Sequence, residues 1–195
     1  MVPSRLEQAI AAIDAANADD PSTLEVRGRT RPKEQAHAEL MTEWLLRLDP
    51  DADEAQQIAA RAHHLRRWSL PRSSYPEGRA GYLRWRTALR KQHAAEVVEL
   101  LEPLGYDRAT VERVQSIIGK AGLGADPAVQ VHEDALCLVF LETQLAALVD
   151  DQGDEKMLDV IAKTAAKMSP EALALVAELP MRDHDRALVA RALGS

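Results

Sequence analysis

Apolar residues recur at helical spacing along almost the whole chain. Leu6, Ile10 and Ile13 follow the Ser4–Glu7 capping box, which predicts a first helix that ends near Asn17. The same periodicity, bounded by Asp caps, prolines and glycines, predicts further helices. They are expected over about 32–48, 54–65, 79–102, 108–121, 127–148, 154–168, 170–179 and 183–193.

Two stretches interrupt this pattern. Residues 19–32 are polar and contain Pro21 and Gly28, so they are expected to form a loop or a weak hairpin. Residues 70–78 contain two prolines and a glycine, which predicts a stiff loop. Since no alternating strand pattern of any length occurs, the sequence predicts an all-α fold in one compact domain, residues 1–195.

Composition narrows the functional classes. Hydrophobic residues make up 46% and charged residues 28%, which is typical of a globular domain. The longest apolar run, 135–141, is too short to cross a bilayer, so no membrane partner is expected. No leader is visible, and the single cysteine, Cys137, fits a cytoplasmic location. The net charge of −7 excludes a globally basic nucleic-acid binder.

Basic charge is nevertheless concentrated in one tract. Residues 61–91 contain eight arginines and one lysine but only one acid, Glu77. Trp68, Tyr75, Tyr82 and Trp85 also lie in this tract. Arginine recognises phosphate or carboxylate through two parallel hydrogen bonds, and aromatic rings can stack a base, so the tract predicts an anion site. The alternative is a solvated basic face that pairs with acidic helices.

The predicted substrate-binding residues come mainly from this tract. We expect Arg67, Arg72 and Arg86 to converge on one anion, with Arg72 held by the stiff loop. His93 lies on the apolar stripe of its helix, where it either faces this site or is buried against a carbonyl. The full predicted set is Arg66, Arg67, Trp68, Arg72, Tyr75, Arg79, Tyr82, Arg86, His93 and Lys120.

The order of histidines and aspartates resembles that of the HD-domain metal phosphohydrolases. His37, the pair His63-His64 and Asp134 match the superfamily's histidine, its His-Asp pair and its final aspartate, with His64 in place of the aspartate. The resemblance implies an HD-like helical arrangement and one divalent transition metal (Mn, Fe, Co or Zn) on these four residues. It also implies His64 and Asp134 as catalytic residues. The literal His184-Asp185 dipeptide lacks matching partners.

A second resemblance covers nearly the whole chain. The segments that carry it are Trp44, Arg66–Trp68, Pro71–Pro76, Gly81–Arg86, Glu133–Asp134, Cys137–Glu142 and Lys167–Ser169, and they resemble the family of domain of unknown function 4202. Members of that family often carry Gln at the place of His63 and usually lack histidine at the place of His37. This resemblance therefore implies that His64 is the important histidine.

Three functions fit these observations. The first is hydrolysis of a small phosphorylated molecule, with nucleotides ranked ahead of other classes, by an HD-like phosphohydrolase. The second is a non-catalytic receptor for such a ligand. The third is an RNA- or tRNA-associated protein that uses the arginine and aromatic surface, and the acidic net charge ranks it last.

Overall fold

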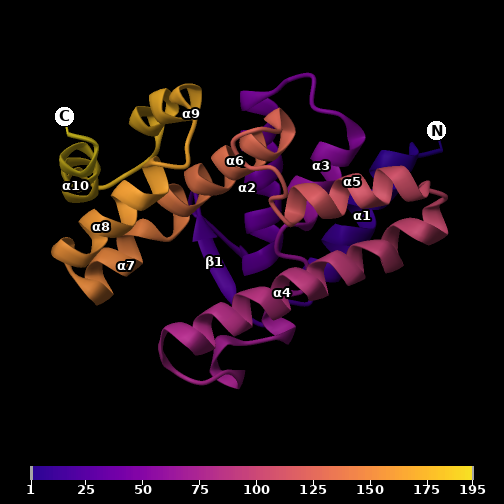
Figure 1. Cartoon of the computed structure of the whole chain (residues 1–195), viewed down its shortest axis with the longest axis horizontal. Coiled ribbons are helices and arrows are strands. Elements are labelled where there is room, and N and C mark those ends of the chain that lie inside the picture. Colours follow the sequence, from indigo (N-terminus) through magenta and orange to yellow (C-terminus); the bar gives the residue numbers. More distant parts are fainter. Residues whose placement is uncertain (1, 195) are drawn as a thin grey trace.

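The structure is a computed structural model that describes residues 2–194, and it consists almost entirely of helices (Figure 1). The α-helices are α1 (Arg5–Ala18), α2 (Lys33–Leu48), α3 (Glu54–Ala62), α4 (Gly78–Leu101), α5 (Arg108–Ile118), α6 (Pro127–Thr143), α7 (Leu145–Gln152), α8 (Asp154–Ala165), α9 (Pro170–Leu175) and α10 (Asp183–Leu193). Short 3-10 helices are η1 (Arg67–Ser69), η2 (Arg72–Ser74), η3 (Glu102–Leu104) and η4 (Val176–Glu178). The strands are β1 (Thr23–Val26) and β2 (Arg29–Pro32). The all-α prediction is confirmed.

Side-chain caps begin several helices where the sequence predicts them. Before α1, the Ser4 hydroxyl accepts a hydrogen bond from the Glu7 amide, and the Glu7 carboxylate accepts one from the Ser4 amide. Asp53 caps α3, Asp107 caps α5 and Asp126 caps α6. Each cap satisfies amide donors that the first helical turn leaves without a partner.

The polar segment after α1 forms the hairpin rather than the loop. Strands β1 and β2 pair antiparallel, with Val26 opposite Arg29. Between them Arg27 and Gly28 have positive φ angles of 50° and 74°. A two-residue turn with both residues in this region matches the twist of the paired strands.

The apolar segment near the end of the chain forms two helices, so the prediction of one helix over 127–148 is wrong. The break is at Gln144, whose φ and ψ of −120° and −23° leave the helical path. No proline or glycine marks the break, since the segment 128–148 contains neither.

Two hydrophobic cores divide the helices. One packs α2 and α6 against α7, α8, α9 and α10, with Met41 and Leu138 at its centre. The other packs α1, α3, α5 and the end of α4 around Ile58 and Ile117. In Figure 1 the C-terminal helices lie at one end of the molecule, α1, α3 and α5 lie at the other, and α2 and α6 lie between. Within residues 2–194, no helix combines the length and apolar character that a membrane span requires.

Candidate functional site

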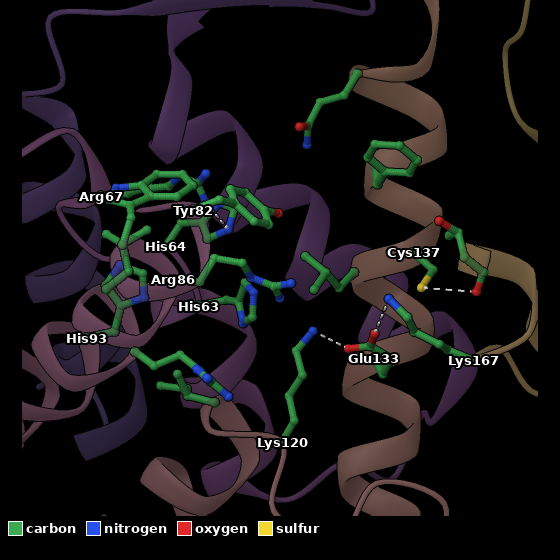
Figure 2. Close-up of a pocket in the computed structure, with 18 of the residues that line it drawn as sticks. His63, His64, Arg67, Tyr82, Arg86, His93, Lys120, Glu133, Cys137 and Lys167 are labelled. Carbon is green, nitrogen blue, oxygen red and sulfur yellow. Dashed lines mark hydrogen bonds and ion pairs between the residues drawn. The ribbon is translucent and has the colours of Figure 1, made fainter. Parts of the chain in front are cut away.

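A cavity of about 280 Å³ lies between the first half of α4, the end of α3 and the helices α6 and α8 (Figure 2). Helix α4 directs Trp85, Leu89 and His93 inward, as its apolar spacing predicts. Tyr82 also lines the cavity but is 43% exposed. The cavity is therefore open to solvent along the first turns of α4.

Basic side chains dominate the polar part of the wall. Five of them line the cavity against a single carboxylate, Glu133; they are Arg67, Arg86, Arg90, Lys120 and Lys167. Glu133 is buried, pairs with Lys120, and lies 3.7 Å from the Lys167 ammonium (Figure 2). Among the ion pairs of residues 2–194, none includes Arg86 or Arg90. The cavity thus carries an excess of positive charge.

Two unusual backbone conformations present these cations. Arg66, directly before Arg67, has a φ of 46°, and Lys120 has a φ of 59°. Residues other than glycine seldom adopt this left-handed region, and those that do cluster at functional sites. Both residues lie at the ends of helical segments, where a sharp turn brings a cationic side chain to the cavity.

Five histidines form one connected group beside the cavity. Ring centroids are 4.0 Å apart for His37 and His64, 4.8 Å for His63 and His64, 4.8 Å for His63 and His132, and 6.2 Å for His64 and His93. Burial is the main cause that lowers the pKa of each, to about 3 for His37 and His132 and to about 4 for His93. All five rings are therefore neutral at pH 7 and keep a lone pair.

Three of the surrounding side chains form a cluster that could hold a metal. Glu34 and His37 lie one turn apart on α2, and His64 follows α3; one ligand atom from each lies within 4.8 Å of the other two. Glu34 is buried, and burial raises its pKa to about 7, although Arg67 opposes the shift. Neither ring nitrogen of His37 has a hydrogen-bond partner within the described chain. Two imidazoles and one carboxylate suit a divalent transition metal and leave coordination positions open.

His64 connects this cluster to the cavity. The Arg67 guanidinium lies 3.1 Å from Nε2 of His64, and because arginine only donates, Nε2 must accept. The proton of the neutral ring is then on Nδ1, which donates to the Glu34 carboxylate at 3.0 Å. His63 has a separate partner, since its Nδ1 lies 2.8 Å from Nε2 of His132.

The structure brings together about half of the predicted site residues. Those that line the cavity or belong to the metal cluster are His37, His63, His64, Arg67, Tyr82, Arg86, His93 and Lys120. Those that do not are Arg66, Trp68, Arg72, Tyr75, Arg79 and Asp134. Of the three arginines predicted to converge on one anion, Arg67 and Arg86 line the cavity and Arg72 does not.

Arg72 fails to reach the cavity because its own loop uses it. Its guanidinium donates to the carbonyl of Tyr75 at 2.8 Å and to that of Gly78 at 3.5 Å. These bonds close the loop before α4. Arg72 thus has a structural role in place of the predicted anion contact.

The structure places Asp134, which was predicted as a metal ligand and catalytic residue, outside the metal cluster, as it does the predicted ligand His63. Oδ1 of Asp134 accepts hydrogen bonds from the Ser169 amide at 2.9 Å and from the Gln130 side chain at 3.0 Å. This carboxylate joins α6 to the start of α9 and does not belong to the metal cluster, where Glu34 supplies the carboxylate instead. His184 is exposed and pairs with Asp154, away from the cavity.

Sequence reasoning missed several residues of the site. They are Glu34, Arg90, His132, Glu133 and Lys167. A signal exists for Glu34, because Glu34 and His37 have the i, i+3 spacing that places two ligands on one face of a helix. Arg90 belongs to the basic tract, and His132 directly precedes the Glu133-Asp134 pair.

Comparison with known proteins identifies the family. Residues 7–189 match the family described as "Domain of unknown function (DUF4202)", in agreement with the resemblance seen in the sequence. Neither the curated proteins nor the solved structures provide a significant match. Since the family match extends over most of its length, the chain belongs to the DUF4202 family.

Proposed function

We propose that this protein binds a small phosphorylated molecule of the nucleotide class in the cavity and hydrolyses its phosphate ester with a divalent transition metal. The observation that supports the proposal most strongly is that His64 belongs to two sites at once. It lines the cationic cavity and also belongs to the cluster with Glu34 and His37. One histidine therefore links the ligands for a metal to the cations for a phosphate.

The cavity wall supports the phosphate part of the proposal. Guanidinium groups bind phosphate oxygens through paired, charge-assisted hydrogen bonds. Arg86 and Arg90 have no carboxylate partner within residues 2–194, so an anion would not have to displace one. Lys120 and Lys167 share one carboxylate, Glu133, and one positive charge of that group remains uncompensated.

The remaining wall supports a ligand with an organic part. The rings of Tyr82 and Trp85 lie 5.9 Å apart between centroids, and Phe140 also lines the cavity. Aromatic faces of this kind can stack a base. The volume of about 280 Å³ is close to the lower end of small-molecule sites, about 300 Å³, which favours a mononucleotide over a polymer.

The proposed roles of the residues follow from their positions. Glu34, His37 and His64 would hold a metal such as Mn, Fe, Co or Zn, which supplies a nucleophile at neutral pH by acidifying water. Arg86 and Arg90 would hold the phosphate and offset the negative charge that develops on its oxygens in the transition state.

Hydrolysis of nucleoside monophosphates and sugar phosphates, measured as phosphate release with added Mn²⁺ or Co²⁺, tests the proposal. We expect turnover that chelation abolishes and that metal restores. His64→Ala should lower the rate by orders of magnitude while circular dichroism shows an intact helical fold. His184→Ala is the matched control, because His184 lies outside the cavity, and it should retain full activity.

A non-catalytic receptor is the second candidate, and one observation favours it. The only acceptor nitrogen of neutral His64 is already bonded to Arg67, so the ring has no free lone pair to serve as a base. Tight binding of a nucleotide that is never turned over, in protein loaded with metal, would support the receptor and contradict the hydrolase.

A further inference from the structure

The Arg67 guanidinium contacts the metal cluster. Arg67 lies in η1, three residues after His64, and its guanidinium stacks over Trp85 with 4.8 Å to the ring centroid. Its Nη1 lies 3.1 Å from Nε2 of His64 (Figure 2). Its Nε lies 4.0 Å from Glu34. The guanidinium therefore contacts two of the three ligands of the metal cluster.

Metal binding and the Arg67–His64 hydrogen bond exclude each other. A neutral imidazole has one lone pair available, and Arg67 already takes it at Nε2. If a metal instead took Nδ1, the ring proton would move to Nε2 and would face the donor group of Arg67. In either arrangement the guanidinium has to leave His64.

A released Arg67 guanidinium remains in a strongly cationic environment. Burial lowers the pKa of Arg67, and Arg86 adds to this effect; Arg86 and Arg90 both line the same cavity. The carboxylate that Arg67 loses, Glu34, would be neutralised by the metal. An anion in the cavity is then the best partner left for the guanidinium.

We propose that Arg67 exchanges between two positions: one on His64 and Glu34, which it occupies without ligands, and one on the phosphate of the ligand, which the metal and the phosphorylated ligand each favour. This inference rests on the proposed function. The exchange makes the binding of metal and of phosphorylated ligand cooperative. Arg67 on His64 blocks the metal and is unavailable to the phosphate, so binding of either one favours binding of the other. By linkage, the metal must strengthen anion binding by the same factor as the anion strengthens metal binding.

Calorimetric titration with Co²⁺, in the absence and presence of saturating sulfate, tests the exchange. In the wild-type protein we expect sulfate to strengthen Co²⁺ binding about tenfold, within the usual range of coupling between sites. In Arg67→Ala, Co²⁺ should bind more tightly than in wild type without sulfate, and the effect of sulfate should largely disappear. Arg67→Met keeps an unbranched stem over Trp85 and carries the same expectations if the alanine variant does not fold.

Arg86→Ala is the matched control, since it removes a cation of the same cavity that does not contact His64. It should weaken sulfate binding but leave the coupling factor at saturating sulfate close to that of wild type. Equal gains in Co²⁺ affinity for Arg67→Ala and Arg86→Ala would show that loss of any positive charge in the cavity explains the gain, and this result would overturn the inference.

The ring protons of His64 give a second readout. In ¹⁵N-labelled, metal-free protein the Nδ1–H tautomer should be present, and sulfate alone should shift the Nε2 resonance as Arg67 moves away. The resonance should not respond to sulfate in Arg67→Ala. Independent binding of Co²⁺ and sulfate would overturn the exchange but not the proposed function, whereas failure of both to bind would overturn the two together.

Discussion

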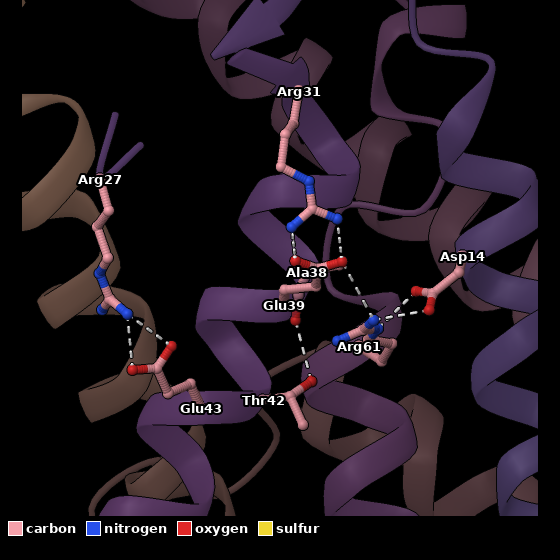
Figure 3. Close-up of polar contacts among 8 residues, drawn as sticks. All are labelled: Asp14, Arg27, Arg31, Ala38, Glu39, Thr42, Glu43 and Arg61. Atoms are coloured by element: carbon pink, nitrogen blue, oxygen red, sulfur yellow. Dashed lines mark hydrogen bonds and ion pairs between the residues drawn. The ribbon is translucent and has the colours of Figure 1, made fainter. Parts of the chain in front are cut away.

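Two groups of arginines in this molecule show opposite relations to acidic residues. On the face formed by the hairpin, α2 and the end of α3, three arginines have carboxylate partners; the pairs are Arg27 with Glu43, Arg31 with Glu39, and Arg61 with Asp14 (Figure 3). In the cavity, Arg86 and Arg90 have none within residues 2–194. The first group is saturated by the protein, and the second is available to a ligand.

This difference shows that a count of arginines along the chain does not locate an anion site. Arg61 belongs to the basic tract of the sequence, yet its guanidinium forms two bonds of 2.6 Å with Asp14. A hollow of about 340 Å³ lies beside the hairpin and also contains arginines, but Glu39 and Glu43 line it with them. Only the balance of neighbouring charges distinguishes the two regions.

We expect the largest effect when the two arginines of the cavity that are unpaired within residues 2–194 are removed. In the double variant Arg86→Ala/Arg90→Ala, kcat/KM for a phosphate ester should fall about a hundredfold or more, since a hydrogen bond to a charged group contributes about 1.5–3 kcal/mol. The double variant Arg27→Ala/Arg31→Ala removes the same charge from the hairpin and should keep the wild-type value. Equal losses in both variants would contradict the distinction.

The pH dependence of metal affinity tests whether Glu34 is a metal ligand beside the cavity. Burial raises its pKa to about 7, so a proton competes with a metal below that pH, whereas the neighbouring histidines are already neutral. The Kd for Mn²⁺ should rise about tenfold for each pH unit below about 7 and level off above it. Glu34→Gln should bind metal weakly and without this dependence; a Kd that is independent of pH in wild type would exclude Glu34 as a ligand.

Arg61 should affect stability rather than binding. Its side chain is only 11% exposed and holds Asp14 with both ends of the guanidinium, so Arg61→Ala should lower the free energy of unfolding by about 2 kcal/mol. Arg90→Ala, on an exposed residue without an ion pair in the described chain, should change it by less than about 0.5 kcal/mol. Urea unfolding measures both, and the reverse order would contradict the assignment of the two groups.

The buried histidines predict a loss of stability in acid. Their pKa values are lowered in the folded state, so between about pH 4 and 6.5 the unfolded chain binds more protons and stability falls as the pH decreases. Glu34 acts in the opposite direction, because its raised pKa of about 7 makes the folded state bind the extra proton between about pH 4.5 and 7. Five histidines outweigh one carboxylate, and urea unfolding should lose more than about 1 kcal/mol per pH unit. A flat profile would show that the rings are not buried as a group.

The smallest expected effect is at Arg72. Since its guanidinium already donates to two loop carbonyls, Arg72→Ala should leave phosphate binding within about twofold of wild type. A loss as large as that of Arg86→Ala, measured by calorimetry, would return Arg72 to the anion site.

Helix positions could be predicted because their signals are local. The Ser4–Glu7 capping box and the caps at Asp53 and Asp126 depend on residues within one turn, so the chain itself contains the information. The break at Gln144 has no such signal in the neighbouring sequence.

The candidate site was predictable only where a residue's role follows from its own segment. His64 and Arg86 lie in segments whose residues suggest a site. Glu34 in the first turn of α2 differs from an ordinary acid at a helix start only by its spacing to His37. Asp134 was misplaced because its partner, the amide of Ser169, lies 35 residues away in the sequence. Which carboxylate faces the histidines is decided by tertiary packing.

Thermal unfolding in phosphate and in chloride at equal ionic strength tests most directly whether the cations of the cavity bind an anion. Wild type and Arg27→Ala/Arg31→Ala should show a higher Tm in phosphate, because a ligand that binds only the folded state stabilises it. Arg86→Ala/Arg90→Ala should lose most of that increase. The same increase in all three proteins, or an increase lost only in the hairpin variant, would contradict the assignment of the cavity as the anion site.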